Sequence, residues 1–277
     1  MNIVPTLRKR RAHAAASVAV LALALTACGG GSGSSGSDDK AKAAGITLVK
    51  SGKLTVCTHL PYKPFQFTQD GETVGFDVDL MDLVADKLGV EQEIFDTPFE
   101  GIQSGESLNT GKCDAAAAGM TITDERARVI DFSEPYFDAT QALLVKKDSG
   151  ITSLDDLSGK SLGVQEGTTG EQYANDNAPD DVEVRSFEDL ALLTAAVKTG
   201  QIDAGINDNG VLFDYVNANP DTEVSAEFDT GEQYGVAVKK DGNDALLKTI
   251  NQVIEDAKSD GTYDEIYKKW FGDVPQS

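Results

Sequence analysis

Two patterns of apolar residues alternate along most of this chain, one with the period of a helix and one typical of buried strands. Leu80, Val84 and Leu88 recur at the spacing of one helix face, and Gly89 follows where such a helix would end. The pattern predicts helices over 75–88, 99–111, 171–175, 245–257 and 263–270, and strands over 53–59, 91–96, 115–118, 141–147, 162–165 and 232–239. Alternation of the two kinds of element is typical of an α/β fold.

One succession of elements occurs twice. In both copies a Phe-Glu pair precedes a helix that ends at Thr-Gly, and an Asp-Ala pair at Asp114 or Asp203 leads into a buried strand. The two strands end in polar residues, at 119–121 and 207–209. The repeat predicts two lobes with chemistry at equivalent strand ends, joined by two crossing strands that act as a hinge. The lobe boundaries that we expect are 46–142 with 238–277 for lobe 1, and 143–237 for lobe 2.

Residues 1–27 have the pattern of a signal peptide rather than of a folded domain. Four basic residues at 8–11 precede an apolar run over 14–25 that is too short to span a membrane. Leu-Thr-Ala-Cys over 25–28 resembles the lipobox of bacterial lipoproteins, which implies that Cys28 is acylated, with palmitate among the acyl chains, and anchors the protein to the outer face of the cell membrane. Residues 28–45 would then be a flexible Gly/Ser tether. The alternative is an ordinary secretory signal with an incidental cysteine.

The net charge of the chain limits the classes of partner that it can bind. Removal of residues 1–27 takes away four of the 24 Lys and Arg and none of the 46 Asp and Glu, so the net charge changes from −22 to −26. A nucleic-acid-binding protein needs basic surface for the phosphates, so the sequence argues against that class. Strong net charge also favours a soluble monomer.

Cys57 and Cys113 remain once Cys28 is set aside. An even number of cysteines in an exported protein is compatible with one disulfide. The two residues lie in or just before strands that could be neighbours, so a bridge is possible. Two reduced, buried cysteines are the alternative.

The stretch 115–137 carries the first candidate binding residues. A run of small residues ends at Gly119, and Thr121 and Arg126 follow. Ligands of α/β folds bind beyond the carboxyl ends of the strands, and a guanidinium can hold a carboxylate through two parallel hydrogen bonds. The sequence therefore predicts a pocket here. The alternative is that Arg126 pairs with Asp124 or Glu125 on an exposed turn.

The second lobe supplies candidates for an opposite wall. Thr168 and Thr169 stand at the start of a helix, where free backbone amides favour an anion, and Asp208 follows the repeated strand. Threonines that only cap the helix, and an aspartate that only caps a loop, are the alternatives.

Together the two walls suit a zwitterion. We expect Arg126 to bind a carboxylate, while Asp208, the Gly119 carbonyl and the Thr121 hydroxyl bind an ammonium group. Aromatic rings of Tyr62 and Phe99 would enclose the side chain of such a ligand.

The chain resembles solute-binding proteins of family 3, which serve ABC importers of polar amino acids. GFDVDLMDLVADKL over 75–88 and the segment AGMTITDER…DFSEPY over 118–136 carry the resemblance, which extends over residues 54–271. It implies a type II periplasmic-binding-protein fold of two α/β lobes, each with a mixed sheet and helices. The lobes of such proteins close over an amino acid, which the protein delivers to a membrane permease. By position, the ligand contacts it implies are Tyr62, Phe99, Ala118, Gly119, Thr121, Arg126, Gln165, Thr168, Thr169 and Asp208.

One departure from the family bears on selectivity. Several members have an aspartate at the position of His59, and its replacement predicts less support for a basic ligand and a preference for a neutral polar or acidic amino acid. Asn207 is a second candidate for selectivity. His59 could instead point away from the cleft.

Other classes of function are less well supported. Some dehydratases share this fold, but Glu166 and His59, the candidate acids, lie in no catalytic arrangement that we recognise, so we expect no enzyme activity. The sequence contains no nucleophile motif, zinc spacing or phosphate loop, and we expect no cofactor or metal. An amino-acid sensor that signals through a partner is a further alternative.

Overall fold

The computed structural model describes residues 41, 42 and 44–272. The predicted signal peptide, the predicted lipidation site Cys28 and most of the tether lie outside the described residues. No helix in the described part is both long and apolar enough to cross a membrane.

The first lobe is built on a five-stranded mixed sheet. Its order is β4–β1–β5–β12–β6, with β1 parallel to β4 and β5, and β12 antiparallel to β5 and β6. The strands are β1 (Lys53–Thr58), β4 (Glu91–Asp96), β5 (Ala115–Ala116), β6 (Ile130–Phe132) and β12 (Ala237–Lys239), and β2 (Phe67–Gln69) pairs with β3 (Glu72–Val74) in a separate hairpin.

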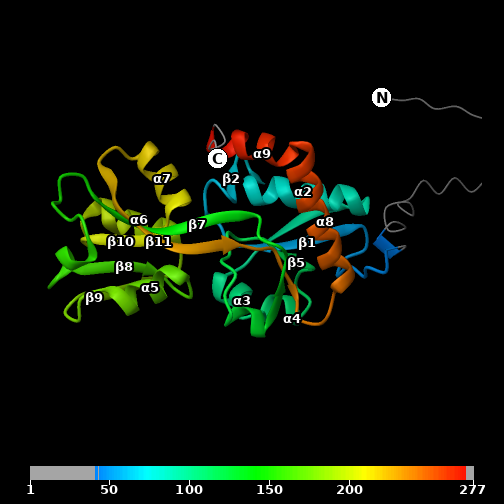
Figure 1. The fold of residues 1–277 in the computed structure, drawn as a ribbon, viewed down its shortest axis with the longest axis horizontal. Helices are drawn as coiled ribbons and strands as arrows, with labels where there is room; N and C mark the ends of the chain where they lie inside the picture. The colour runs from blue at the N-terminus through cyan, green and yellow to red at the C-terminus, as the bar shows by residue number, and fades with distance from the viewer. Residues whose placement is uncertain (1–40, 43, 273–277) are drawn as a thin grey trace, which may run out of the picture. The chain divides into compact units, whose positions relative to one another are not determined.

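Helices cover both faces of this sheet (Figure 1). The longer ones lie on one face and two short ones on the other. They are α2 (Phe76–Leu88), α8 (Asp244–Asp260) and α9 (Thr262–Phe271) on the first face, and α3 (Phe99–Gln103) and α4 (Glu106–Asn109) on the second.

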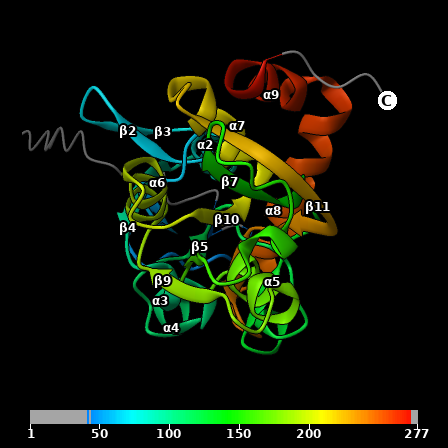
Figure 2. The same ribbon diagram turned by 90° about the vertical axis from the view of Figure 1, so that its left-hand side faces the viewer.

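The second lobe, which faces the viewer in Figure 2, repeats this plan. The order of its sheet is β11–β7–β10–β8–β9. β10 lies between a parallel neighbour, β8, and an antiparallel one, β7, as β5 lies between β1 and β12. The elements are β7 (Phe137–Lys146), β8 (Ser161–Gln165), β9 (Glu183–Phe187), β10 (Ala204–Asp208), β11 (Thr222–Tyr234), α5 (Thr169–Asn177), α6 (Leu190–Thr199) and α7 (Asn209–Ala218). The prediction of two lobes from the sequence repeat is confirmed.

The chain passes twice between the sheets. β7 and β11 are long antiparallel partners, paired from Phe137 with Tyr234 to Lys146 with Thr222. The strand predicted over 232–239 is in fact two strands, since β11 ends at Tyr234 in the second sheet and β12 begins at Ala237 in the first.

The helix predicted over 99–111 is likewise divided into α3 and α4. Gly105 separates them at a φ of 75°, and a Cβ there would lie 2.9 Å from the Cγ2 atom of Ile130. Only glycine adopts this backbone conformation without cost, so the helix ends where the chain must pack closely on β6. Two 3₁₀ turns, η1 (Arg126–Arg128) and η2 (Leu154–Leu157), complete the described elements.

A disulfide joins Cys57 on β1 to Cys113 before β5, with Cα atoms 5.6 Å apart. Both residues belong to the buried cluster between the sheet and α3, which also contains Phe99 and Leu108. The bridge therefore ties together the two strands whose carboxyl ends lead to the candidate site.

Candidate functional site

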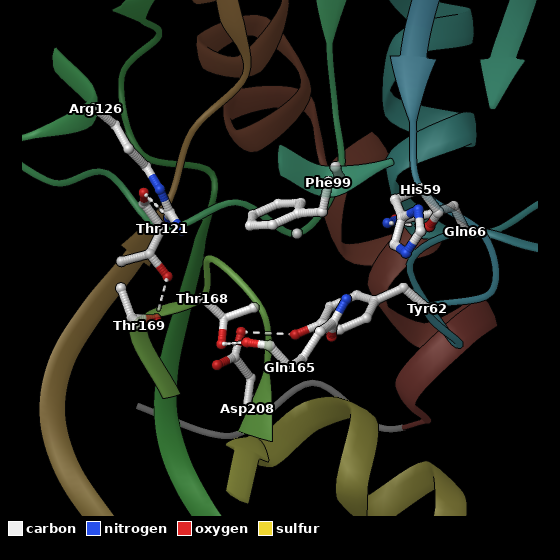
Figure 3. A pocket seen from close by; sticks show the side chains of 12 residues that line it. His59, Tyr62, Gln66, Phe99, Thr121, Arg126, Gln165, Thr168, Thr169 and Asp208 are labelled. Atoms are coloured by element: carbon white, nitrogen blue, oxygen red, sulfur yellow. Dashed lines mark hydrogen bonds between the residues drawn. The ribbon is translucent and has the colours of Figure 1, made fainter. Parts of the chain in front are cut away.

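A pocket lies where the strand ends of the two lobes meet (Figure 3). Arg126 and Thr121 occupy one end in this view, His59 and Gln66 the other, and the rings of Phe99 and Tyr62 lie between them. The residues that line it are His59, Tyr62, Gln66, Phe99, Ala118, Gly119, Thr121, Arg126, Gln165, Thr168, Thr169 and Asp208. The structure thus brings together all ten ligand contacts expected from the resemblance. Asn207 is not among the lining residues.

Arg126 points into the pocket rather than along its own turn. Its Nη1 donates to the Thr121 carbonyl oxygen (2.7 Å) and its Nη2 to the Gly167 carbonyl oxygen (3.0 Å). The guanidinium lies 5.2 Å from the centre of the Phe99 ring, and only 5% of the residue is exposed. The alternative, a pair with Asp124 or Glu125 on an exposed turn, does not hold, because Arg126 is buried and its guanidinium donates to these two carbonyl oxygens. Burial lowers the pKa of Arg126, which the charges of Asp208 and Glu232 oppose.

Asp208, the last residue of β10, carries the charge opposite to that of Arg126. Its carboxylate accepts hydrogen bonds from the hydroxyls of Tyr62 (2.8 Å) and Tyr234 and from the side-chain amide of Gln141. Asp208 stands at the start of α7 but its side chain caps no helix amide, so the loop-capping alternative does not describe it. Burial, with the nearby charge of Glu232, raises the pKa of Asp208 from 3.8 to about 6.

The two threonines of the second wall differ. Thr168 does cap α5, since its hydroxyl accepts from the Glu171 amide (3.2 Å) while it donates to the Gln165 carbonyl oxygen (2.7 Å). The capping alternative therefore applies to Thr168. The hydroxyl of Thr169 instead donates to Glu232 (2.7 Å).

Glu232 does not line the pocket but bonds to residues that do, and the sequence reasoning missed it. Its Oε2 accepts from the hydroxyls of Thr121 in the first lobe and Thr169 in the second, both at 2.7 Å, and its Oε1 accepts from Gln141 (3.0 Å). The signal that could have found it is the period of a strand, which places Glu232 on the same side as Tyr234 at the predicted crossing.

Gly119 is held by a residue outside the pocket. Its φ is 54°, and a Cβ would lie 2.7 Å from a ring carbon of Tyr62. Its amide donates to Asp77 at the start of α2 (2.8 Å), whose other oxygen accepts from the Tyr136 hydroxyl (2.8 Å). The Gly-Phe-Asp sequence at 75–77 thus supports the loop that contains Gly119, here called the binding loop, without lining the pocket.

Tyr62 connects the lobes. Its hydroxyl lies 2.8 Å from both Oδ1 of Asn207 and Oδ2 of Asp208, and it can donate to one at a time. The side-chain amide of Asn207 donates to Gln165 (3.1 Å). Asn207 therefore acts beneath the pocket wall, on residues that line it.

His59 faces the pocket, so the alternative that it points away does not hold. Its Nδ1 lies 3.1 Å from the Thr97 carbonyl oxygen. Gln66 beside it is a second residue that the sequence reasoning missed; a glutamine between the apolar Phe65 and Phe67 was the available signal.

The pocket combines groups that can hold a polar ligand with opposite charges. It offers one buried cation, one buried carboxylate and several hydroxyls and amides, with two rings between its ends. No group of three or more His, Cys, Asp or Glu that could hold a metal ion occurs among the described residues.

Comparison with known proteins gives a consistent picture. The family described as bacterial extracellular solute-binding proteins, family 3, matches residues 54–273. The ABC transporter glutamine-binding protein GlnH of Bacillus subtilis is 41% identical over 210 residues, which are 74% of this chain and 75% of GlnH.

Two similar solved structures are each of an ancestral arginine-binding protein. The one bound to arginine is 46% identical and superposes with a TM-score of 0.74, covering 80% of this chain and 99% of its own. The one bound to glutamine is 44% identical with a TM-score of 0.76, covering 81% of this chain and 100% of its own. The relatives named here are binding proteins and not enzymes. This chain belongs to the bacterial extracellular solute-binding proteins of family 3.

Proposed function

We propose that this protein is the extracytoplasmic substrate-binding component of an ABC importer and that it delivers a polar L-amino acid to the permease. The observation that carries the proposal is the pair of opposite buried charges, Arg126 and Asp208, in one pocket between two lobes. Buried charges are costly unless they are paired, and the two charged groups of an amino acid complement both.

Each charged group of the ligand would have a set of partners. The structure shows two hydrogen bonds from the Arg126 guanidinium, which has five N–H donors, so others can go to a carboxylate. The ammonium group would donate to Asp208, to the Gly119 carbonyl and to the Thr121 hydroxyl. The roles of Ala118, Gln165, Thr168 and Thr169 as further contacts rest on the same geometry.

The side chain of the ligand would lie between Tyr62 and Phe99. Named relatives bind glutamine or arginine, so the fold accepts both neutral and basic side chains. Because His59 supplies no fixed negative charge, we infer a neutral polar or acidic amino acid rather than a basic one.

The test is a titration of the protein against the common L-amino acids by calorimetry, with Arg126→Met alongside. Removal of one partner from a buried charge pair costs roughly 2–5 kcal/mol, so the variant should bind at least about thirtyfold more weakly. Arg128→Met is the matched control, since Arg128 is exposed in the same 3₁₀ turn. Equal binding by both variants, or no binding of any amino acid, would refute the proposal.

We also propose that Cys28 carries the lipid anchor. The lipobox-like sequence and the Gly/Ser tether after it support this. Mass spectrometry of the N-terminal peptide from membranes tests it, and an unmodified cysteine there would exclude the anchor.

A further inference from the structure

One end of the pocket contains two buried polar atoms without partners among the described residues. Figure 3 shows His59 and Gln66 side by side at this end, beyond Phe99 and Tyr62 as seen from Arg126. The Nε2 atom of His59 and the Oε1 atom of Gln66 are both buried and make no hydrogen bond. Buried polar atoms without partners are rare in folded proteins, so such atoms in a pocket indicate a place where a ligand binds.

The neighbours of the two side chains define which kind of atom each presents. The Nδ1 of His59 lies 3.1 Å from the Thr97 carbonyl oxygen, and a carbonyl can only accept, so Nδ1 carries the hydrogen. Nε2 of the neutral ring is then an acceptor. The Nε2 of Gln66 is turned toward the His59 carbonyl oxygen at 3.5 Å, which leaves the acceptor Oε1 on the other side. This end of the pocket therefore presents two acceptors.

Charge narrows the choice further. Asp208 is the one acidic residue among the twelve described residues that line the pocket, and its carboxylate already accepts from Tyr62, Tyr234 and Gln141. A guanidinium or ammonium group beside His59 and Gln66 would be buried without a counter-charge. A carboxylate has no hydrogen to donate and would face two acceptors.

We propose that His59 and Gln66 recognise the end of the ligand's side chain and select a primary carboxamide, as in glutamine or asparagine. One amide nitrogen carries two hydrogens, one for each acceptor. The inference rests on the proposed function. The presence of His59 in place of an aspartate predicted a neutral polar or acidic amino acid, and the inference selects the amides from that group.

The experiment is calorimetry on the protein at pH 8, where an imidazole in water is neutral. L-Glutamine is compared with the side-chain methyl ester of L-glutamate, and L-asparagine with that of L-aspartate. Each ester also has a neutral side chain but carries no N–H group at its end. L-Glutamate and L-arginine complete the set. At least one amide should bind about tenfold or more tightly than its ester, because the ester leaves both acceptors without partners.

Gln66→Met tests the residue itself, since methionine has a similar size and no acceptor of comparable strength. The ratio of amide to ester affinity should fall several-fold toward one. The matched control is Gln92→Met. Gln92 donates to the Val78 carbonyl oxygen (2.9 Å) and also has a buried Oε1 without a partner, but it lies outside the pocket, so the ratio should not change.

The outcomes separate the inference from the function on which it rests. If esters bind as tightly as amides, or if glutamate or arginine binds more tightly than both amides, the inference is wrong while amino-acid binding stands. If no amino acid binds, the proposed function itself fails. The comparison of amide with ester on the unaltered protein decides the matter even if Gln66→Met does not fold.

Discussion

Asp77 shows how a residue outside the pocket positions a residue within it. Asp77 is 2% exposed, and its carboxylate accepts hydrogen bonds from the Gly119 amide and the Tyr136 hydroxyl. Burial raises the pKa of Asp77 from 3.8 to about 7, and the two hydrogen bonds oppose that shift only in part. The residue thus fixes the binding loop at a cost in stability when it is ionised.

The pH dependence of stability follows from this shift. Between pH 3.8 and about 7 folded Asp77 keeps a proton that the unfolded chain has lost, so its contribution to stability falls as pH rises. In Asp77→Asn this dependence is absent. The free energy of unfolding of the variant, relative to the unaltered protein, should therefore rise by about 3 kcal/mol from pH 5 to pH 8.

Urea unfolding at the two pH values measures this difference. Asp86→Asn is the control, because Asp86 is exposed on the same helix, α2, and its difference should stay flat. A flat difference for Asp77→Asn as well would contradict the assigned cause.

At the scale of elements, β1 and β5 present the first wall of the pocket. They are parallel neighbours, with Val56 beside Ala115 and Cys57 beside Ala116. β5 is only two residues long, so few ladder hydrogen bonds hold it. The disulfide between Cys57 and Cys113 supplements this short pairing.

Loss of that disulfide should lower the free energy of unfolding. Its residues are 56 positions apart, and in the chain-entropy description a closed loop of this length contributes about 4 kcal/mol. We expect a loss of about that size in Cys57→Ala/Cys113→Ala, measured by urea unfolding. A reducing agent should destabilise the unaltered protein and leave the double variant unchanged. Equal stability of the unaltered protein and the double variant in the absence of reducing agent would show that the bridge is dispensable.

At the scale of the described molecule, direct hydrogen bonds join the two lobes across the pocket. Tyr62 contacts Asn207 and Asp208, and Arg126 donates to the Gly167 carbonyl. A ligand that touches both walls favours closure by adding contacts that the open form lacks. We therefore expect closure and binding to be one equilibrium, to which residues that join the lobes contribute.

This coupling gives a prediction for Tyr62→Phe. The variant loses the hydroxyl that bonds a carboxylate across the lobes, and a hydrogen bond to a charged group contributes roughly 1.5–3 kcal/mol, so affinity for the bound amino acid should fall about tenfold or more. Calorimetry measures this. Tyr173→Phe is the control, since Tyr173 packs on Phe228 in the second lobe, away from the pocket lining.

Small-angle scattering tests the closure itself. The radius of gyration of the unaltered protein should decrease when the amino acid is added. Identical dimensions with and without it would contradict closure on binding.

The sequence alone determined the class of fold and the two lobes, and its resemblance to a known family supplied ten of the residues that line the pocket. The fold and the lobes follow from local and repeated signals: strand and helix periods, the Asp-Ala entries at Asp114 and Asp203, and polar residues where buried strands end. Such signals can be read from the sequence because each helix or strand must bury one face, which sets the spacing of its apolar residues. Ala118 and Gln165 were expected as contacts from the resemblance alone. For Arg126 the sequence left two alternatives: a side chain that enters the pocket, or one that pairs with Asp124 or Glu125 on an exposed turn.

Only the tertiary structure decided what depends on contacts between distant residues. Glu232 joins Thr121 of the first lobe to Thr169 of the second through its carboxylate. The division of 99–111 at Gly105 likewise comes from close packing on Ile130. Burial then set the pKa values of Asp77 and Asp208, since the loss of water around a carboxylate depends on the whole fold rather than on its neighbours in sequence.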